Sequence, residues 1–555
     1  MNKLLLTSIL FFHCYTYTAD QTVGLFTQTD KSYNGYTLFS PLVSKTTYLI
    51  NNCGKQVHSW TSKYNPGNSV YLLEDGTLLR TGNTMNQAFD NTGGSGGIIE
   101  WLDWEGKVLW SYPISDNTFL QHHDVAYLPN GNILAIVWEK ISGADAIAAG
   151  RNPTTVGDEL WSERIVELAT VGTDSASVVW EWRVWDHLVQ EYDNAKENYG
   201  TVSEHPELIN LNMVQGKQVI ADWLHINSVT YNPELNQIMM SVHNFSEIWI
   251  IDHSTTKTEA ASHTGGTYGK GGDLLYRWGN PKCYNSGSVS DQKFFAQHDA
   301  TWITTGADSG NIMVYNNGMN RPEGNYSSVD VISPPIKADG SYNLSVGQAF
   351  GPASQTWVYT SPNKTDFYSA SISGASRLAN GNTLVCEGQE GRFFEIDGDG
   401  TIVWEYVNPV SRTGAVSQGT VMGGTPPNGN PNPVFRCYRY APDFPGFAGK
   451  NLTAGDPIEL NPLDYACDVT AIGPGTCPGV NFEVYPNPSN GNFTLLLPDT
   501  DSWELSVYDV SGKLMKQSAG SRVSKTKLFM EREGIYFLSV NAGKISYHKK
   551  LQVVH

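Results

Sequence analysis

Charged side chains are scarce in this sequence, and basic ones are the scarcest. Asp, Glu, Lys and Arg make up 16% of the 555 residues, with 36 Lys and Arg against 55 Asp and Glu. The formal net charge is −19, and the basic residues form no cluster. Both features argue against nucleic acid as a partner, because binding phosphates needs a basic surface. An acidic surface is also what a soluble exported protein needs.

Long apolar runs are also missing. The one short run, Leu4–Cys14, follows Lys3 and precedes Ala19. It is too short to span a bilayer. A basic start, an apolar centre and a small residue are typical of a secretory signal peptide. We therefore expect residues 1–19 to be a signal peptide and the mature chain to be soluble and exported.

Cysteine pairs with metal-ligand spacing are absent as well. Six cysteines remain after the expected signal peptide, and no two of them form a CxxC motif, which argues against a zinc knuckle. Cys467 and Cys477 lie in a stretch rich in Gly and Pro, where we expect a small disulfide loop. The other four fit buried thiols or further bridges equally well. They are Cys53, Cys283, Cys386 and Cys437.

Turn-forming and aromatic residues, by contrast, are abundant, with 54 Gly, 27 Pro, 16 Trp and 28 Tyr. This composition suits an all-β protein. One pattern recurs six times, an apolar strand that ends on Trp, usually after a glycine turn. The six copies are 54–60, 106–110, 177–180, 272–278, 355–357 and 400–404. Six such endings predict six blades of a β-propeller.

A second recurring pattern opens the units. Asn130-Gly131 and Asn380-Gly381 each separate two alternating apolar strands, a strong hairpin signal. The first unit is short, so we expect Val434–Tyr440 to complete it and close the ring, which removes exposed sheet edges. We assign residues 20–445 to the six-bladed propeller, 446–480 to a linker and 481–555 to a small C-terminal β-sandwich.

The C-terminal segment resembles the sorting domain of the type IX secretion system. The similarity is carried by Val484–Phe493, Leu505–Leu514 and Gly534–Val540 and covers nearly the whole segment. It implies that the secretion machinery is a partner and that the protein is secreted or placed on the cell surface.

The hairpin register aligns polar residues at the starts of five opening strands. Counting back seven residues from the turn, or matching His298-Asp299 to His123-Asp124, gives one position in each blade. The five positions are Asn68, His123, His225, His298 and Ser373. Opening strands line the central channel of a propeller, so these residues should form a ring around its axis. Three histidines in register predict a functional site, whereas His122 should point away as a structural residue.

Clustered histidines suit either a metal or anion chemistry. Zinc and copper both accept imidazole ligands. However, no carboxylate or cysteine accompanies the ring in register, because Asp124 and Asp299 should point to the opposite strand face. We therefore predict no metal and no cofactor at this ring. Neutral and protonated imidazoles together can instead supply a nucleophile and proton donors near neutral pH.

At these residues the chain resembles the arylsulfate sulfotransferase family, which works without a nucleotide sulfate donor. The similarity runs over most of residues 24–450. The matching motifs lie at 123–132, 222–229, 246–252, 276–281 and 297–299. The resemblance implies a ping-pong transfer of a sulfuryl group from an aryl sulfate to a phenol through a sulfohistidine. By position, His298 matches the nucleophile, and His225, Asn227 and His123 match the groups that bind the sulfuryl oxygens and move the phenol proton.

One position departs from the family pattern. An arginine is expected eighteen residues after His225, where this chain has His243. Three explanations stay open. His243 is protonated on binding, Arg277 or Arg392 reaches the site, or activity is weakened. Asn317, in a predicted turn, is a further candidate at the border of the site.

Two other functions are compatible with the sequence. One is an exported propeller that acts as a binding or adhesion module, and the other is a metal-dependent propeller lyase or hydrolase. The intact set of histidines favours the transferase, with a small aryl sulfate and a phenolic acceptor as its substrates. The oligomeric state is left open.

Overall fold

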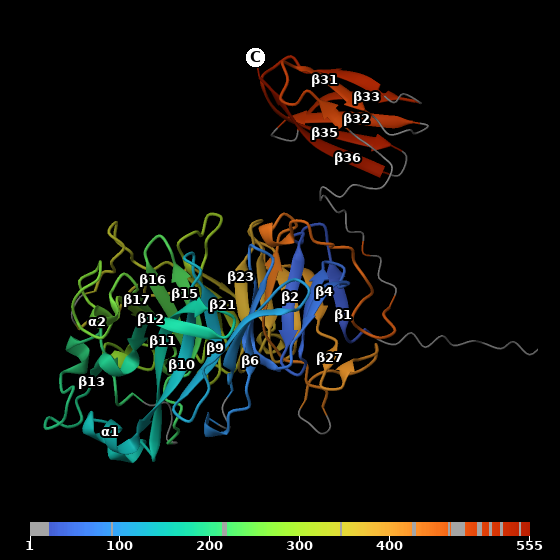
Figure 1. The fold of residues 1–555 in the computed structure, drawn as a ribbon. Coiled ribbons are helices and arrows are strands. Elements are labelled where there is room, and N and C mark those ends of the chain that lie inside the picture. Colours follow the sequence, from blue (N-terminus) through green and yellow to red (C-terminus); the bar gives the residue numbers. More distant parts are fainter. Residues whose placement is uncertain are drawn as a thin grey trace, which may run out of the picture. The chain divides into compact units, whose positions relative to one another are not determined.

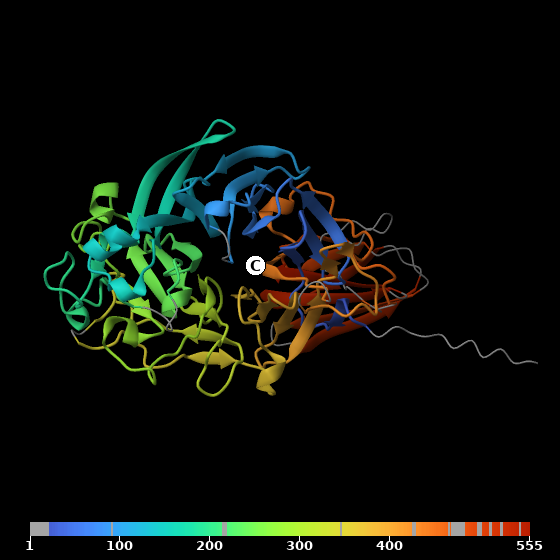
Figure 2. The same cartoon turned by 90° about the horizontal axis from the view of Figure 1, so that it is seen from below.

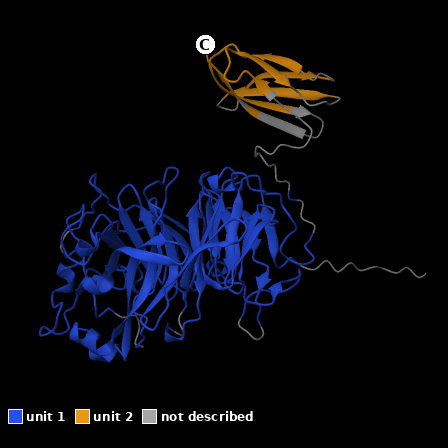
Figure 3. Ribbon diagram, viewed as in Figure 1, with its two compact units in different colours: residues 1–469 blue, residues 470–555 orange. Residues whose placement is uncertain are grey.

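The computed structural model describes residues 21–554, except 90–92, 214–218, 345–346, 425–428, 464–466, 468–482, 497–501, 510–512, 522–524 and 543–544. The predicted signal peptide and Cys477 lie outside these residues. The chain forms two compact units, residues 1–469 and 470–555, each described by itself (Figure 3). No helix among the described residues is long and apolar enough to cross a membrane.

The first unit is the six-bladed β-propeller that the sequence predicts, with its blades arranged around a centre (Figures 1 and 2). Every blade is an antiparallel sheet of four strands, and the sixth carries one strand more. From the axis outward, the first blade contains β29 (Val434–Tyr440), β2 (Tyr36–Pro41), β3 (Thr46–Asn51) and β4 (Gln56–Thr61). The second contains β5 (Pro66–Leu72), β6 (Leu78–Asn83), β7 (Gly97–Leu102) and β8 (Val108–Pro113). The third contains β9 (Phe119–Tyr127), β10 (Ile133–Ser142), β11 (Glu159–Val171) and β12 (Ser175–Arg183).

The other three blades follow the same order. The fourth blade contains β15 (Ile226–Asn232), β16 (Gln237–Val242), β17 (Glu247–Asp252) and β18 (Tyr276–Trp278). The fifth contains β19 (His298–Trp302), β20 (Ile312–Asn316), β21 (Ser328–Ile332) and β22 (Trp357–Tyr359). The sixth contains β23 (Gly374–Arg377), β24 (Thr383–Glu387), β25 (Arg392–Ile396), β26 (Ile402–Val407) and β1 (Gly24–Gln28). The six innermost strands contact one another in a closed circle.

Short elements lie in the loops between strands. Among the described residues the α-helices are α1 (Gly143–Ala148) and α2 (Lys257–Ala260), beside short 3-10 turns. Two small sheets pair β13 (Leu188–Val189) with β14 (Ile209–Asn210) and β27 (Val410–Ser411) with β28 (Gly414–Ala415).

The ring closes as predicted, because β29 pairs with β2 to supply the inner strand of the first blade. A disulfide adds a second closure, between Cys53 and Cys467. Our expectation of a Cys467–Cys477 bridge is therefore wrong. The reason is that the chain after the propeller runs back along the first blade, where the Gly455 N–H donates to the Gln56 carbonyl at 2.8 Å. Cys283, Cys386 and Cys437 are buried free thiols.

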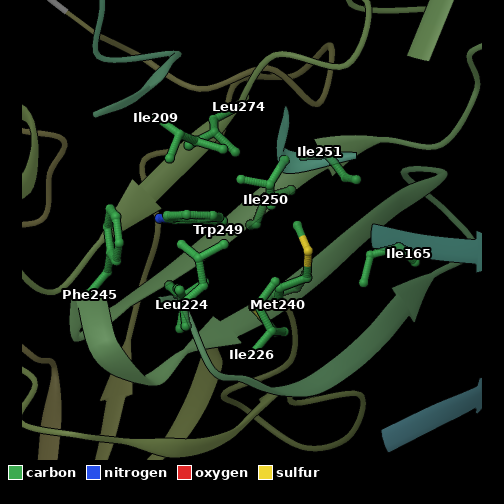
Figure 4. Packing of buried hydrophobic residues seen from close by; sticks show 14 of the residues in the cluster. Ile165, Ile209, Leu224, Ile226, Met240, Phe245, Trp249, Ile250, Ile251 and Leu274 are labelled. Carbon is green, nitrogen blue, oxygen red and sulfur yellow. The ribbon is translucent and has the colours of Figure 1, made fainter. Parts of the chain in front are cut away.

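The largest part of the core lies between the third and fourth blades. Trp249 on β17 is fully buried among aliphatic side chains, including Ile226, Met240 and Ile165 (Figure 4). Burying a large side chain of this kind stabilises the fold by roughly 1.5–3 kcal/mol. Such packing holds the opening strands of these blades, and with them the histidines, in fixed positions.

The second unit is a two-sheet β-sandwich. One sheet contains β30 (Glu483–Tyr485), β31 (Asn492–Leu496) and β34 (Lys525–Phe529), and the other contains β33 (Leu514–Gly520), β32 (Trp503–Asp509), β35 (Gly534–Ala542) and β36 (Ile545–Val553). Trp503, Leu505 and Leu538 belong to its own buried core.

Candidate active site

Four histidine rings meet at the axis of the propeller. The ring centroids of His123 and His225 are 4.6 Å apart, those of His225 and His243 5.1 Å, and those of His243 and His298 5.3 Å. The structure thus brings together the three histidines of the predicted ring and the histidine at the expected arginine position.

Bulges in the opening strands turn these side chains inward. His123 and His225 adopt left-handed backbone conformations, with φ of 49° and 57°. The pairing of β9 with β10 shifts register beside His123, and that of β15 with β16 shifts just after His225. In the fifth blade the left-handed residue is Asp299, one position after His298. Gly94 packs on the His123 ring so closely that an added Cβ would lie 1.8 Å from its Cε1.

His298 is held in one tautomer. Its Nδ1 lies 2.8 Å from the Asn317 Oδ1, and the Asn317 Nδ2 donates to the carbonyls of Ser369 and Ile372. The amide orientation leaves Oδ1 as the acceptor, so His298 carries its hydrogen on Nδ1 and a lone pair on Nε2. Burial, reinforced by His243, holds the pKa of His298 well below its usual range. The ring is therefore neutral at neutral pH, and its Nε2 accepts the Ile372 N–H at 3.2 Å.

His225 forms a pair with a carboxylate. Its Nδ1 lies 2.5 Å from the Asp222 Oδ2, and its side chain is 15% exposed. A carboxylate on one imidazole nitrogen orients the ring and fixes which nitrogen carries a hydrogen. Next in the chain, the Ile226 N–H donates to both oxygens of the buried Glu163, which fixes the backbone that carries His225.

His123 is oriented by His122 rather than by a carboxylate. The two Nδ1 atoms are 2.8 Å apart, and His122 stacks on Trp138 with centroids 3.9 Å apart. We expected His122 to point away, but the bulge at His123 interrupts the alternation that would separate neighbouring side chains. Burial and the proximity of His225 hold the pKa of both residues well below the usual range.

His243 lies between His225 and His298. Its Nδ1 is 2.7 Å from the Asn244 Oδ1. Burial, helped by His225, lowers its pKa to about 4. It is therefore neutral at neutral pH. Because the Asn244 Nδ2 donates to the Asp222 carbonyl, the Asn244 Oδ1 accepts the Nδ1–H of His243, and Nε2 is left as an acceptor, whereas an arginine there would bring a fixed charge and several donors.

The buried charge of the hub comes from Arg436, which the sequence reasoning missed. Its guanidinium spans the channel, with Nη1 2.8 Å from the Asp124 Oδ2, Nε 3.1 Å from the Asp299 Oδ1 and Nη2 donating to the Asn227 carbonyl. We expected both aspartates to point away from the ring, but each faces this arginine instead. Burial raises the pKa of Asp299 to about 6, although Arg436 opposes the shift. The signal was present in the sequence, because Arg436 lies in the strand predicted to close the ring.

Three other predicted site residues form no hydrogen bond with a histidine side chain in the described part of the chain: Asn227, Ser373 and Asn68. Asn227 is fully buried, and its Nδ2 donates to the Gln297 carbonyl, just before His298. Ser373 donates to the Ser369 Oγ and accepts the Gly388 N–H, which fixes the loop that reaches His298. Asn68 is buried with a φ of 99°, and its Nδ2 has no hydrogen-bond partner among the described residues.

Arg277 and Arg392 do not reach the histidines. Arg277 pairs with Glu247, and both side chains are fully buried. Arg392 lies between Glu387 and Glu405. Both guanidiniums are thus committed to carboxylates of their own blades, so the structure gives neither a place beside the histidines.

Comparison with known proteins places this site in a family. The family model described as arylsulfotransferase (ASST) matches residues 70–402, more than half of the chain. The chain belongs to this family. Membership supports an aryl sulfotransferase with aryl sulfate and phenol substrates. A second model, the secretion system C-terminal sorting domain, matches residues 483–554. This member of the arylsulfotransferase family is therefore exported by type IX secretion, to the medium or the cell surface.

No curated protein matches the sequence. Solved structures are similar only at low identity. One is a protein of unknown function from Bacteroides caccae, with 12% identity, 74% of this chain and 99% of that chain covered, and a TM-score of 0.38. Another is a putative 6-phosphogluconolactonase from Bacteroides fragilis, with 10% identity, coverage of 74% and 99%, and a TM-score of 0.34. A third is virginiamycin B lyase from Staphylococcus aureus, with 10% identity, coverage of 70% and 88%, and a TM-score of 0.30.

Proposed function

We propose that this arylsulfotransferase works by a ping-pong mechanism in which His298 carries the sulfuryl group. The observation that supports this most strongly is the environment of His298, a neutral imidazole whose Nδ1–H is held by Asn317. Its Nε2 lone pair is the nucleophile that such a transfer needs, and it must leave its hydrogen bond with the Ile372 N–H before it attacks.

In the first half-reaction, the His298 Nε2 attacks the sulfur of the aryl sulfate. The bond between sulfur and the aryl oxygen breaks, and the leaving oxygen takes a proton from His225, whose ring Asp222 orients. The products are a phenol, a neutral His225 and an N-sulfated His298. The positive charge that develops on the His298 ring strengthens its hydrogen bond to Asn317.

In the second half-reaction, an acceptor phenol gives its proton to the neutral His225. The phenol oxygen attacks the sulfur, the N–S bond breaks, and the lone pair returns to the His298 Nε2. His123 flanks this path and is neutral, so its ring N–H group can donate to a sulfuryl oxygen. The N–H group of neutral His243 donates to the Asn244 Oδ1, so its Nε2 faces the path as an acceptor. The transferred group stays anionic throughout.

Arg436 supports the strands that carry the histidines. It is fully compensated by Asp124 and Asp299, so it holds the opening strands of the third, fourth and fifth blades together. It also contributes to keeping the pKa of His298 low. We assign it as a positioning residue.

Release of 4-nitrophenol from 4-nitrophenyl sulfate, with and without phenol, tests this function. We expect turnover to depend on phenol and to be lost in His298→Ala. The matched control is His253→Ala, a partly buried histidine paired with Glu167 and outside the hub cluster. Release that needs no acceptor would indicate a sulfatase, and an active His298→Ala protein would refute the assignment. No turnover across a panel of donors would favour a binding module.

A further inference from the structure

A second group of histidines lies between the outer strands of the third and fourth blades. His187 follows β12 of the third blade, and His263 and Asp273 lie between β17 and β18 of the fourth. The Nδ1 atoms of both histidines are 2.8 Å from the same oxygen, the Asp273 Oδ1. The potential ligand atoms of the three residues all lie within 4.8 Å of one another.

The hydrogen bonds of His187 do not balance in its neutral form. Its Nε2 lies 2.8 Å from the Ala260 carbonyl oxygen, which can only accept, so Nε2 must carry a hydrogen. A neutral ring then has a lone pair on Nδ1, where it faces the Asp273 carboxylate, a second acceptor. The Ala260 carbonyl and the Asp273 carboxylate can only accept hydrogen bonds, unlike a side-chain amide, which can be turned to present its donor. Either a proton must therefore lie between Nδ1 and the carboxylate, or a metal ion must bind both atoms.

The surroundings favour the metal. Two imidazoles and a carboxylate are ligands that zinc takes, with water in the fourth position. A zinc-binding histidine usually donates its other N–H to a carbonyl, as His187 does to Ala260. The side chains of His187 and Asp273 are 0% and 8% exposed, whereas that of His263 is 59% exposed. The group is thus fixed on one side and open to solvent on the other, which gives an ion a path in and a water a place to bind.

Glycines between β17 and β18 let this segment of the chain pack closely on His187. Gly265, Gly266 and Gly271 have φ of 113°, 69° and 56°, which turn the segment back on itself. At Gly272 an added Cβ would lie 2.5 Å from the His187 Nε2. From the other side, Trp182 stacks parallel to His187 and donates to the Gly272 carbonyl at 2.7 Å.

We propose that His187, His263 and Asp273 bind one zinc ion that joins the third and fourth blades. The ion is structural and lies outside the histidine cluster of the hub. The proposal does not rest on sulfuryl transfer, and its test does not use that activity.

The test measures zinc bound to the exported full-length protein. The protein is stripped with a chelator, dialysed against zinc chloride and then against metal-free buffer, and its metal content is measured by plasma mass spectrometry. We expect one zinc per chain in the wild type and none in His263→Ala, whose exposed side chain can be removed without opening the core. The matched control is His205→Ala, another exposed histidine paired with a carboxylate, Glu207. It should keep its zinc.

The hub is the main competing site, so His298→Ala is measured in the same way and should also keep one zinc. Zinc should raise the unfolding temperature of the stripped wild type and leave that of His263→Ala unchanged. A wild type that retains no zinc would overturn the proposal in favour of a protonated His187. Equal zinc content in His263→Ala and the wild type would overturn it too, because the ion would then be bound elsewhere.

Discussion

Replacing Asn317 by alanine tests whether the tautomer and charge of His298 matter for transfer. The variant removes the acceptor that lies 2.8 Å from the His298 Nδ1. A neutral hydrogen bond contributes about 0.5–1.5 kcal/mol and one to a charged group about 1.5–3 kcal/mol. The ring becomes cationic only during transfer. The variant should therefore destabilise the transition state by about 1–2 kcal/mol more than it destabilises the free enzyme. This difference corresponds to a rate lowered roughly 5- to 30-fold.

The assay measures the rate of the first turnover of 4-nitrophenyl sulfate without an acceptor, in a rapid-mixing experiment. Asn316→Ala is the matched control, because the neighbouring Asn316 is also buried and bonds to Phe295, Lys293 and Asp330 rather than to a histidine. We expect the Asn317 variant to lose rate and the Asn316 variant to keep it when both are folded. A first turnover within twofold of wild type in Asn317→Ala would refute the reasoning, as would an equal loss in the control.

Two further predictions concern the neighbouring groups. Asp222→Asn should slow transfer from phenyl sulfate about a hundredfold and from 4-nitrophenyl sulfate much less, because a good leaving group needs little help from the proton on His225; equal losses measured with the two donors would argue against the acid role. For His243, the folded-state pKa of about 4 lies below the ordinary value of 6.5, so the unfolded chain takes up the proton first as the pH falls. The free energy of unfolding should therefore drop by about 3 kcal/mol between pH 6.5 and pH 4 through this group alone. His243→Gln should lack this part of the drop in urea unfolding at the two pH values, and identical pH profiles would contradict the prediction.

The architecture was predictable because it repeats. The Trp endings and Asn-Gly turns indicate six blades. The short first unit predicts that β29 is the closing strand, and the pairing of β2 with β29 confirms it. The disulfide was not predictable, because the contact between Cys53 and Cys467 depends on the path of the chain after the propeller.

Side-chain directions at the hub were predicted less well. A strand that alternates strictly would separate His123 from His122 and from Asp124, yet all three take part in the hub because His123 is left-handed within a bulge. Arg436 escaped notice because its strand comes from the far end of the sequence and lacks the hairpin turn that set the register of the others. The pair formed by Asp222 and His225, three residues apart, could have been found from the sequence alone.

The most direct test of the central proposal is to trap the sulfated enzyme. The protein is incubated with an aryl sulfate and no acceptor, quenched in alkali, digested and sequenced by mass spectrometry. We expect one added SO₃ group on His298, which disappears when phenol is supplied and never forms in His298→Ala. A sulfuryl group on any other residue, or release of phenol with no labelled residue, would contradict it.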